Sequence, residues 1–175
     1  MPLDRQLVIF SADSARPSTR DLAGLLVGAA HVTTMGGTAR VSVMVDAAWR
    51  VHALAAEFAA RGLSISWEHA QDDYWVRTSY STALKELRPP SFLDGSRLRL
   101  WFMASGRLEE DTVVFKLGNN HALARRALAP LGLDGAIERG PVIRIKGAGK
   151  LARLADLIGE RPPSASAAAW PDRLR

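Results

Sequence analysis

Two nine-residue stretches, Leu22 to Ala30 (LAGLLVGAA) and Leu98 to Gly106 (LRLWFMASG), occupy the same place in two similar halves of the chain. Both are leucine-rich and are expected to be helical. Each is followed by a short polar stretch and then by a β-branched run that favours a strand, Arg40 to Val45 in the first half and Thr112 to Leu117 in the second. Because the same order of signals occurs twice, the sequence predicts an internal repeat.

The signals after these strands also agree between the halves. Apolar residues at helical spacing predict an amphipathic helix over Val51 to Phe58 and another over Ala124 to Leu131. Each helix is followed by a predicted pair of strands and a last short helix; the strands span residues 64–68, 74–79, 136–139 and 142–146. The order α-β-α-β-β-α, found twice, predicts an α+β fold with pseudo-two-fold symmetry.

The repeat also predicts the domain organisation. We expect a first repeat over residues 1–88, a connector over 89–95, a second repeat over 96–161 and a flexible tail over 162–175. The connector is too short for two independent domains, so we expect a monomer with an internal pseudo-dimer. Trp170 is the one expected anchor point of the tail.

Composition excludes several classes of protein. The 175 residues are 47% hydrophobic and 23% charged, which is typical of a globular chain, and the absence of cysteine excludes disulfides and thiolate metal sites. No stretch approaches the ~18 apolar residues of a membrane span, and the amino terminus lacks signal-peptide order, so we expect a cytoplasmic protein. A net charge of +5 is compatible with an anionic partner.

The two nine-residue stretches resemble the motifs of a monomeric, two-repeat LAGLIDADG homing endonuclease. Residues 22–26 (LAGLL) resemble the LAGLI start, and residues 101–103 (WFM) resemble the start of the second-repeat version. The resemblance implies that the two motif helices pack side by side beneath a saddle of antiparallel strands. The small residues expected at that helix contact are Gly24, Gly28, Ala29, Ala30, Ala104 and Gly106, while Arg99 departs from the alanine usual at its position.

In this family an acidic residue at the end of each motif helix holds divalent metal ions at the scissile phosphates. Aligned residue by residue, those acids fall on Ala29 and Ser105, and neither side chain replaces a carboxylate as a ligand for Mg²⁺. The nearest titratable side chains are Glu109, Glu110, Asp111 and His31. We expect the acids to lie in a solvated turn, and histidine is a poor Mg²⁺ ligand. The sequence therefore predicts no catalytic residues, no metal site and no cofactor.

Binding of double-stranded DNA does not need those metals, because cations near phosphates supply affinity and strand side chains read base edges. Strand alternation predicts which side chains face the DNA. The predicted DNA-binding residues are Arg40, Ser42, Met44, Ser64, Ser66, Arg77, Ser79, Lys116, Arg139, Arg144 and Lys146. Trp49, Trp67 and Trp101 lie beside apolar runs and are expected in the core.

Three functions follow from this combination. We expect a catalytically inactive protein that binds double-stranded DNA sequence-specifically and acts as a transcriptional regulator. A protein that binds DNA in this way would be associated with the nucleoid, and a protein partner is compatible with this role. One alternative is a divergent homing endonuclease with relocated metal ligands. The other is a protein-interaction module that retains only the fold, an alternative kept open by the modest charge and by Glu68 on the proposed face.

Overall fold

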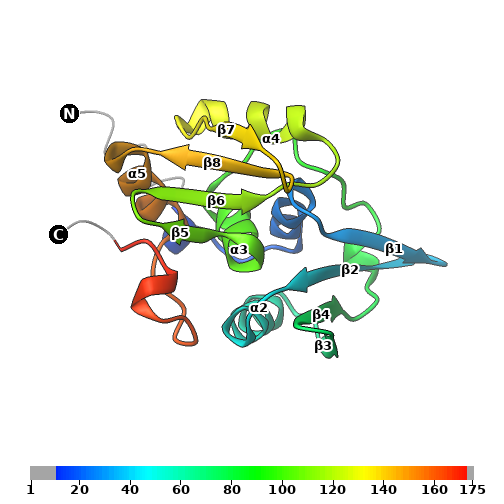
Figure 1. Cartoon of the computed structure of the whole chain (residues 1–175). Helices are drawn as coiled ribbons and strands as arrows, with labels where there is room; N and C mark the ends of the chain where they lie inside the picture. The colour runs from blue at the N-terminus through cyan, green and yellow to red at the C-terminus, as the bar shows by residue number, and fades with distance from the viewer. Residues whose placement is uncertain (1–10, 173–175) are drawn as a thin grey trace.

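Two four-stranded antiparallel sheets flank a central pair of helices in this computed structural model, which describes residues 11–172 (Figure 1). The first half contains η2 (Thr19–Val27), β1 (His31–Met35), β2 (Thr38–Val45), α2 (Ala48–Ala60), β3 (Ile65–Ala70), β4 (Asp73–Thr78) and η3 (Thr82–Leu84). The second contains α3 (Gly95–Ser105), β5 (Arg107–Glu109), β6 (Thr112–Lys116), α4 (His121–Leu128), η4 (Ala129–Leu131), β7 (Ala136–Glu138), β8 (Val142–Lys146) and α5 (Ala148–Ile158). Short turns η1 (Ala12–Ser14) and η5 (Ala167–Ala169) flank the two halves.

The two sheets have the same topology, which confirms the predicted repeat and the α+β class. Their strand orders are β1-β2-β4-β3 and β5-β6-β8-β7, and every neighbouring pair is antiparallel. None of the helices within residues 11–172 is both long enough and apolar enough to cross a membrane.

Each half contains one strand more than the sequence predicted. The stretches between motif helix and first predicted strand, expected to be irregular, form β1 and β5. Each extra strand is joined to the next by a two-residue turn, Gly36-Gly37 or Glu110-Asp111, whose first residue has a φ of 60° or 55°. β1 lies at the edge of its sheet and is mostly exposed, so it lacks the alternating apolar residues by which strands are recognised.

The first motif helix begins at a capping box. The side chain of Ser18 accepts from the backbone of the first turn, and the carboxylate of Asp21 accepts a 2.9 Å hydrogen bond from the Ser18 backbone N–H. The helix winds as a 3₁₀ helix and ends at Val27, earlier than the predicted Ala30, with Gly28 as its C-cap.

The two motif helices, η2 and α3, pack directly against each other, as the resemblance implied. A Cβ atom on Gly24 would collide with the backbone carbonyl of Arg97, so glycine is required for this close approach. Arg99 points away from the contact: its guanidinium donates to a carboxylate oxygen of Glu57 at 2.9 Å and to the carbonyl oxygen of Ile158 at 2.7 Å. The departure at Arg99 therefore leaves the helix contact intact.

One hydrophobic core joins the halves, and it corrects one tryptophan prediction. Trp101 is fully buried and donates a 3.0 Å hydrogen bond from Nε1 to the carbonyl oxygen of Lys116, while Trp49 packs against the core from a partly buried position. Trp67, also predicted in the core, is 51% exposed. It lies on the edge strand β3, on the helix side of the sheet, where its ring contacts His69 and Tyr74.

The predicted flexible tail is wrong for residues 162–172, which pack on the body; residues 1–10 and 173–175 lie outside the described part. Trp170 is 1% exposed, and its indole meets the rings of Trp49 and Phe102 edge-on. Its Nε1 donates to the carbonyl oxygen of Gly159 at 3.1 Å. The segment therefore acts as a strap between α2 of the first half and α3 of the second.

Candidate nucleic-acid interface

The candidate interface is the outer face of each sheet, which we define as the face turned away from the hydrophobic core. In β2 the buried Val41, Val43 and Val45 point to the core, so the alternate residues point outward. The strands β1 and β5 begin directly after η2 and α3, which pack together. The two sheets, and with them their outer faces, therefore begin next to each other at the C-terminal ends of the motif helices.

The outer face of the first sheet contains most of the predicted residues of that half. Registration across the sheet places Ser42 beside Arg77 and Arg77 beside Ser66, while Met44 lies beside Trp75. Arg40 is on the same face of β2. Ser42 is 6% exposed, which leaves little of it available for contact. Ser64 and Ser79 lie opposite each other at the open end of the β3–β4 hairpin, where the Ser79 backbone N–H donates a 2.8 Å hydrogen bond to the Ser64 carbonyl oxygen.

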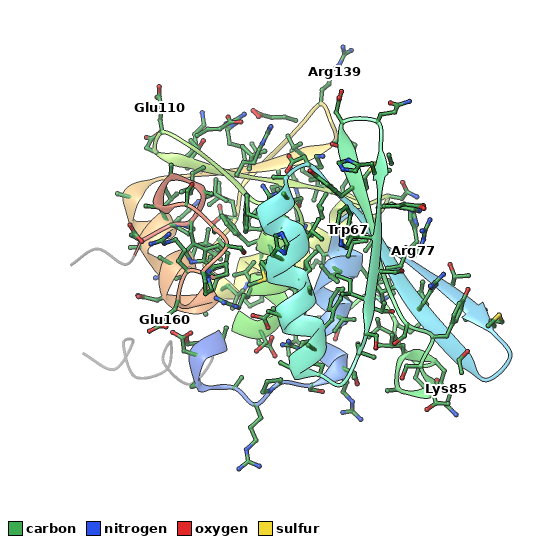
Figure 2. All side chains as sticks on the ribbon, turned by 90° about the horizontal axis from the view of Figure 1, so that it is seen from below. Trp67, Arg77, Lys85, Glu110, Arg139 and Glu160 are labelled. Atoms are coloured by element: carbon green, nitrogen blue, oxygen red, sulfur yellow. The ribbon has the colours of Figure 1, made fainter. Side chains whose placement is uncertain are left out.

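The outer face of the second sheet holds the remaining predicted residues. Lys116 on β6, with Arg144 and Lys146 on β8, alternates with buried isoleucine, phenylalanine and valine side chains. Arg139 precedes the turn Gly140-Pro141 between β7 and β8 and projects from the tip of that hairpin (Figure 2).

Sequence reasoning missed the outer-face side chains of the two extra strands. Thr33 faces Arg40 and Met35 faces Thr38 across the β1–β2 ladder, and Arg107 and Glu109 occupy the corresponding strand β5. The turn residues Gly36-Gly37 were the available signal, since a two-glycine turn after a polar stretch is typical of a β-hairpin.

The arginines of the outer faces are held by neighbouring side chains. Arg77 forms a 3.0 Å ion pair with Glu68 and lies 5.4 Å from the centre of the Trp75 ring. Arg40 lies 4.4 Å from the centre of the Tyr80 ring. Fixed in this way, the guanidinium groups lose less side-chain entropy when a ligand binds.

Arg144 is the most strongly held cation of the second sheet. Its guanidinium forms a 2.6 Å ion pair with Glu109 and a 2.8 Å ion pair with Glu138, and it donates to Thr112 Oγ1 at 3.1 Å. The hydrogen bond from Arg144 lowers the pKa of the Glu109 carboxyl, and the hydrogen bonds that Arg144 donates to Glu109 and Glu138 raise the pKa of Arg144. Four acids, namely Glu68, Asp73, Glu109 and Glu138, share the outer faces with the cations. The surface is therefore mixed in charge.

The ends of the two motif helices meet near Lys116. Ser105 Oγ accepts a 3.3 Å hydrogen bond from the Lys116 backbone N–H, and a Cβ atom on Gly28 would lie 3.3 Å from the Lys116 carbonyl oxygen. Ala29, next to Gly28, is exposed, and Ser105 is half-buried. The two positions aligned with the family's acids thus flank one strand end and carry a methyl group and a hydroxyl.

The titratable side chains near the two helix ends lie in separate surroundings. Within residues 11–172 no three His, Asp or Glu side chains gather closely enough to hold a metal ion. Glu109 is engaged by Arg144, Glu110 projects from the β5–β6 turn, and the His31 ring meets the Trp75 ring edge-on at 6.5 Å. Asp111 lies in the same β5–β6 turn, and its carbonyl oxygen accepts a hydrogen bond from the backbone N–H of Gly147, which follows β8.

A buried arginine fixes the end of the second motif helix. Arg50, on α2, is 3% exposed and donates to the carbonyl oxygens of Phe102, Met103 and Gly106 at 2.9, 3.1 and 2.7 Å. Its Nε also donates to Asp46 at 2.8 Å. Burial lowers the pKa of Arg50 from its usual value, and Asp46 opposes that shift. These bonds satisfy carbonyl groups that a helix end leaves open.

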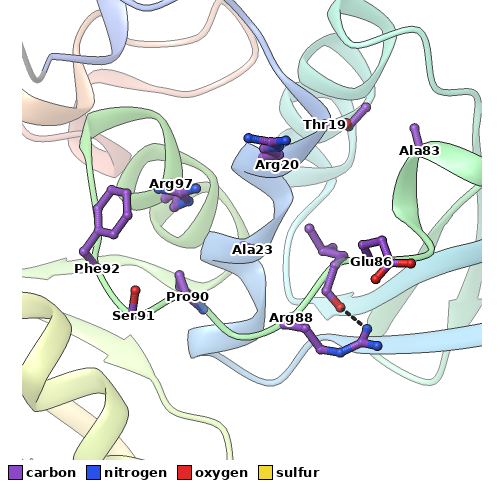
Figure 3. A pocket seen from close by; sticks show the side chains of 11 residues that line it. Thr19, Arg20, Ala23, Ala83, Glu86, Arg88, Pro90, Ser91, Phe92 and Arg97 are labelled. Carbon is purple, nitrogen blue, oxygen red and sulfur yellow. Dashed lines mark hydrogen bonds between the residues drawn. The ribbon is translucent and has the colours of Figure 1, made fainter.

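A separate cavity of about 520 Å³ lies at the opposite, N-terminal ends of η2 and α3 (Figure 3). Its lining includes Arg20, Arg88 and Arg97, with Glu86 and with Phe92, whose ring lies under the Arg97 guanidinium at 4.6 Å. The cavity is thus separated from the outer faces by the length of the motif helices.

Comparison with known proteins gives a likeness in structure only. No family model matches the chain, and no curated protein does. Full-length DUF199/WhiA from Thermatoga maritima is similar with a TM-score of 0.64 and 16% identity over 91% of this chain. This chain spans 57% of that protein's length.

Two further solved structures give the same result. The N-terminal LAGLIDADG domain of DUF199/WhiA has a TM-score of 0.62 at 15% identity, over 90% of this chain and 84% of that one. The homing endonuclease I-WcaI, bound to its DNA recognition sequence, has a TM-score of 0.53 at 10% identity, over 90% of this chain and 87% of that one. Identities this low compare folds, and the fold implied by the two motifs is confirmed: the chain has the LAGLIDADG fold.

Proposed function

We propose that the protein binds double-stranded DNA sequence-specifically through the outer faces of its two sheets and does not cleave it. The observation that carries the proposal is the strand alternation shared by both sheets. Buried aliphatic residues face the core, and Arg40, Arg77, Arg144 and Lys146 face outward on the two sheets. Such side chains supply both phosphate contacts and hydrogen bonds to base edges.

The absence of cleavage follows from the ends of the motif helices. Two-metal cleavage needs hard oxygen ligands at the scissile phosphates, and positions 29 and 105 offer none that is charged. The Ser105 hydroxyl accepts a hydrogen bond from the Lys116 backbone N–H and the Gly106 carbonyl oxygen accepts one from Arg50, which supports a helix end that is held in place but lacks charged metal ligands at positions 29 and 105. A protein of this kind acts by occupying its site, and we propose transcriptional regulation by occupancy as its role.

A second candidate function is a protein-interaction module. The observation that favours it is the pairing of outer-face cations with Glu68, Glu109 and Glu138, because each pair removes positive potential that would attract phosphate. The structure of the first sheet weighs against it, since Arg40 there makes no ion pair with any described residue.

The deciding experiment is selection of bound duplexes from a random library, followed by a cleavage assay of the enriched sequence with Mg²⁺ and Mn²⁺. Enrichment of one sequence without cleavage supports the proposal. Metal-dependent cutting by homogeneous protein, abolished by Glu109→Ala or Glu110→Ala, would instead establish a nuclease with relocated ligands. No enrichment at low salt would favour the interaction module.

A further inference from the structure

We infer that the two sheets recognise half-sites of different composition, and that Met35 and Met44 of the first sheet read the C5-methyl groups of thymines. The inference rests on the proposed function and names the base chemistry that its first sheet selects. Met35 lies on β1, which was not predicted from the sequence.

Both methionines are exposed apolar groups on the outer face. Met35 is 60% exposed at the tip of the β1–β2 hairpin, and Met44 is 43% exposed near the other end of β2. Met44 lies beside Trp75, and Met35 faces Thr38 across the ladder. The other methionine of the described residues, Met103, is only 1% exposed.

The chemistry of a thioether restricts what these residues recognise in DNA. A methionine side chain donates no hydrogen bond and accepts one only weakly, so it contributes little to binding a phosphate or a polar base edge. In the major groove the thymine methyl is the apolar group that distinguishes one base pair from the others. Burial of one methyl group against a thioether is worth about a fourfold change in affinity.

The separation of the two methionines predicts the spacing of the two thymines. Met35 is at the same level of the ladder as Thr38, and Met44 follows Thr38 by six residues along β2. A strand rises ~3.3 Å per residue, so the two thioethers lie about 20 Å apart along the strand. Base pairs rise ~3.4 Å, so a strand lying along the groove places the two thymines about six base pairs apart. Arg40 lies between them and faces an intervening base or phosphate.

The second sheet offers different chemistry on its outer face. Its outer face carries Arg144 between Glu109 and Glu138, and no methionine among the described residues. Arginine donates to guanine O6 and N7, and glutamate accepts from cytosine N4, so adjacent groups of both kinds suit a G·C pair. The first half-site is therefore expected to contain the two methyl-dependent positions, and the second to contain none.

The test uses the full chain and the duplex enriched by selection, in which each thymine is replaced in turn by deoxyuridine, which lacks the methyl group. We expect wild-type affinity to fall about fourfold at two positions roughly six base pairs apart. Met35→Gln should abolish the effect at one position and Met44→Gln at the other. Thr34→Gln, on the same hairpin but the opposite face, is the matched control and should change neither.

Each result separates this inference from the function on which it rests. If no duplex is enriched, the proposed function fails. If a duplex is bound but no deoxyuridine substitution matters, or if the methionine variants retain the full methyl effect, the protein binds DNA and the thymine inference is wrong. Circular dichroism of both methionine variants checks that they are folded.

Discussion

The guanidinium of Arg50 donates a 2.7 Å hydrogen bond to the carbonyl oxygen of Gly106, joining a helix of the first half to the last turn of the second motif helix. Asp46 holds the same guanidinium from the other side, at 2.8 Å. The contact is buried and joins residues far apart in sequence, so one side chain couples the two halves. The pseudo-dimer is therefore stabilised by an asymmetric element as well as by its repeat.

Arg50→Met should destabilise the protein by about 3 kcal/mol, because it leaves three helix-end carbonyl groups and Asp46 without their donor. Chemical unfolding at pH 7 measures the change. Arg126→Met is the matched control, since Arg126 is an exposed arginine in helix α4, and it should cost less than about 0.5 kcal/mol. Equal losses in the two variants would show that the Arg50 network contributes nothing specific.

Gly24→Ala should destabilise the protein by about 2 kcal/mol, because the added methyl group meets the Arg97 backbone at the closest point of the motif helices. Gly37→Ala is the control: a methyl group there meets nothing within 4 Å. Thermal unfolding of both variants distinguishes them. A stable Gly24→Ala protein would mean that the helices do not approach as described.

Restoring the family's acids, with Ala29→Asp and Ser105→Asp, should lower stability by about 1 kcal/mol in the absence of metal. Ala29 follows the C-cap of η2 and Ser105 is the last residue of α3, so the helix dipole disfavours a carboxylate at both positions, and Ser105 loses the hydroxyl that accepts a hydrogen bond from Lys116. Added Mg²⁺ should recover part of the loss by binding the folded state. Melting curves with Mg²⁺ and with EDTA provide the measurement; an unchanged melting temperature under both conditions would place the two residues apart.

Trp170→Ala should cost about 3 kcal/mol, because a large buried ring and its hydrogen bond to Gly159 are lost. Trp67→Ala removes an equally large ring from a half-exposed edge strand and should cost much less. The unfolding midpoints of the two variants in urea give the comparison. A Trp170→Ala variant of unchanged stability would instead favour the flexible tail predicted from composition.

Lowering the pH should weaken the ion pairs of Glu57, whose carboxylate pairs with Arg61 at 2.7 Å and with Arg99 at 2.9 Å. Burial alone raises the pKa of Glu57, but the two arginines outweigh it and hold the pKa below its usual range. A lowered folded-state pKa contributes stability above the unfolded-state value of about 4.3 and loses it as the pH falls through the folded-state value. Glu57→Gln should therefore cost about 1 kcal/mol at pH 7 and less at pH 3. Melting temperatures across that range test it, and a loss that does not change with pH would contradict it.

The sequence predicted the repeat, the presence of the helices and the outward alternation of β2 and β8 because these follow from short-range periodicity. It did not predict β1, whose residues are polar and exposed on an edge strand, so no apolar pattern indicates pairing. It predicted Trp170 as the anchor point of the tail, which its contacts with Trp49 and Phe102 confirm, but it did not predict that the rest of residues 162–172 packs on the body, since a Ser/Ala-rich tract gives no sign of tertiary contacts. Trp67 was placed in the core because the apolar run around it does not reveal that β3 is an edge.

Under the proposed DNA-binding function, the pairing of Arg77 and Arg144 with outer-face glutamates has a consequence for the kinetics of target search. A cation already neutralised by a carboxylate releases few counterions when it approaches DNA, so random sequence is held weakly and the salt dependence of binding is shallow. Dwell times on non-target DNA are then short, and sliding along the duplex contributes little. Such a protein finds its site mainly by repeated three-dimensional encounters. The time it stays bound at that site depends on base contacts that compensate for breaking the arginine–glutamate ion pairs or sharing the arginine with DNA.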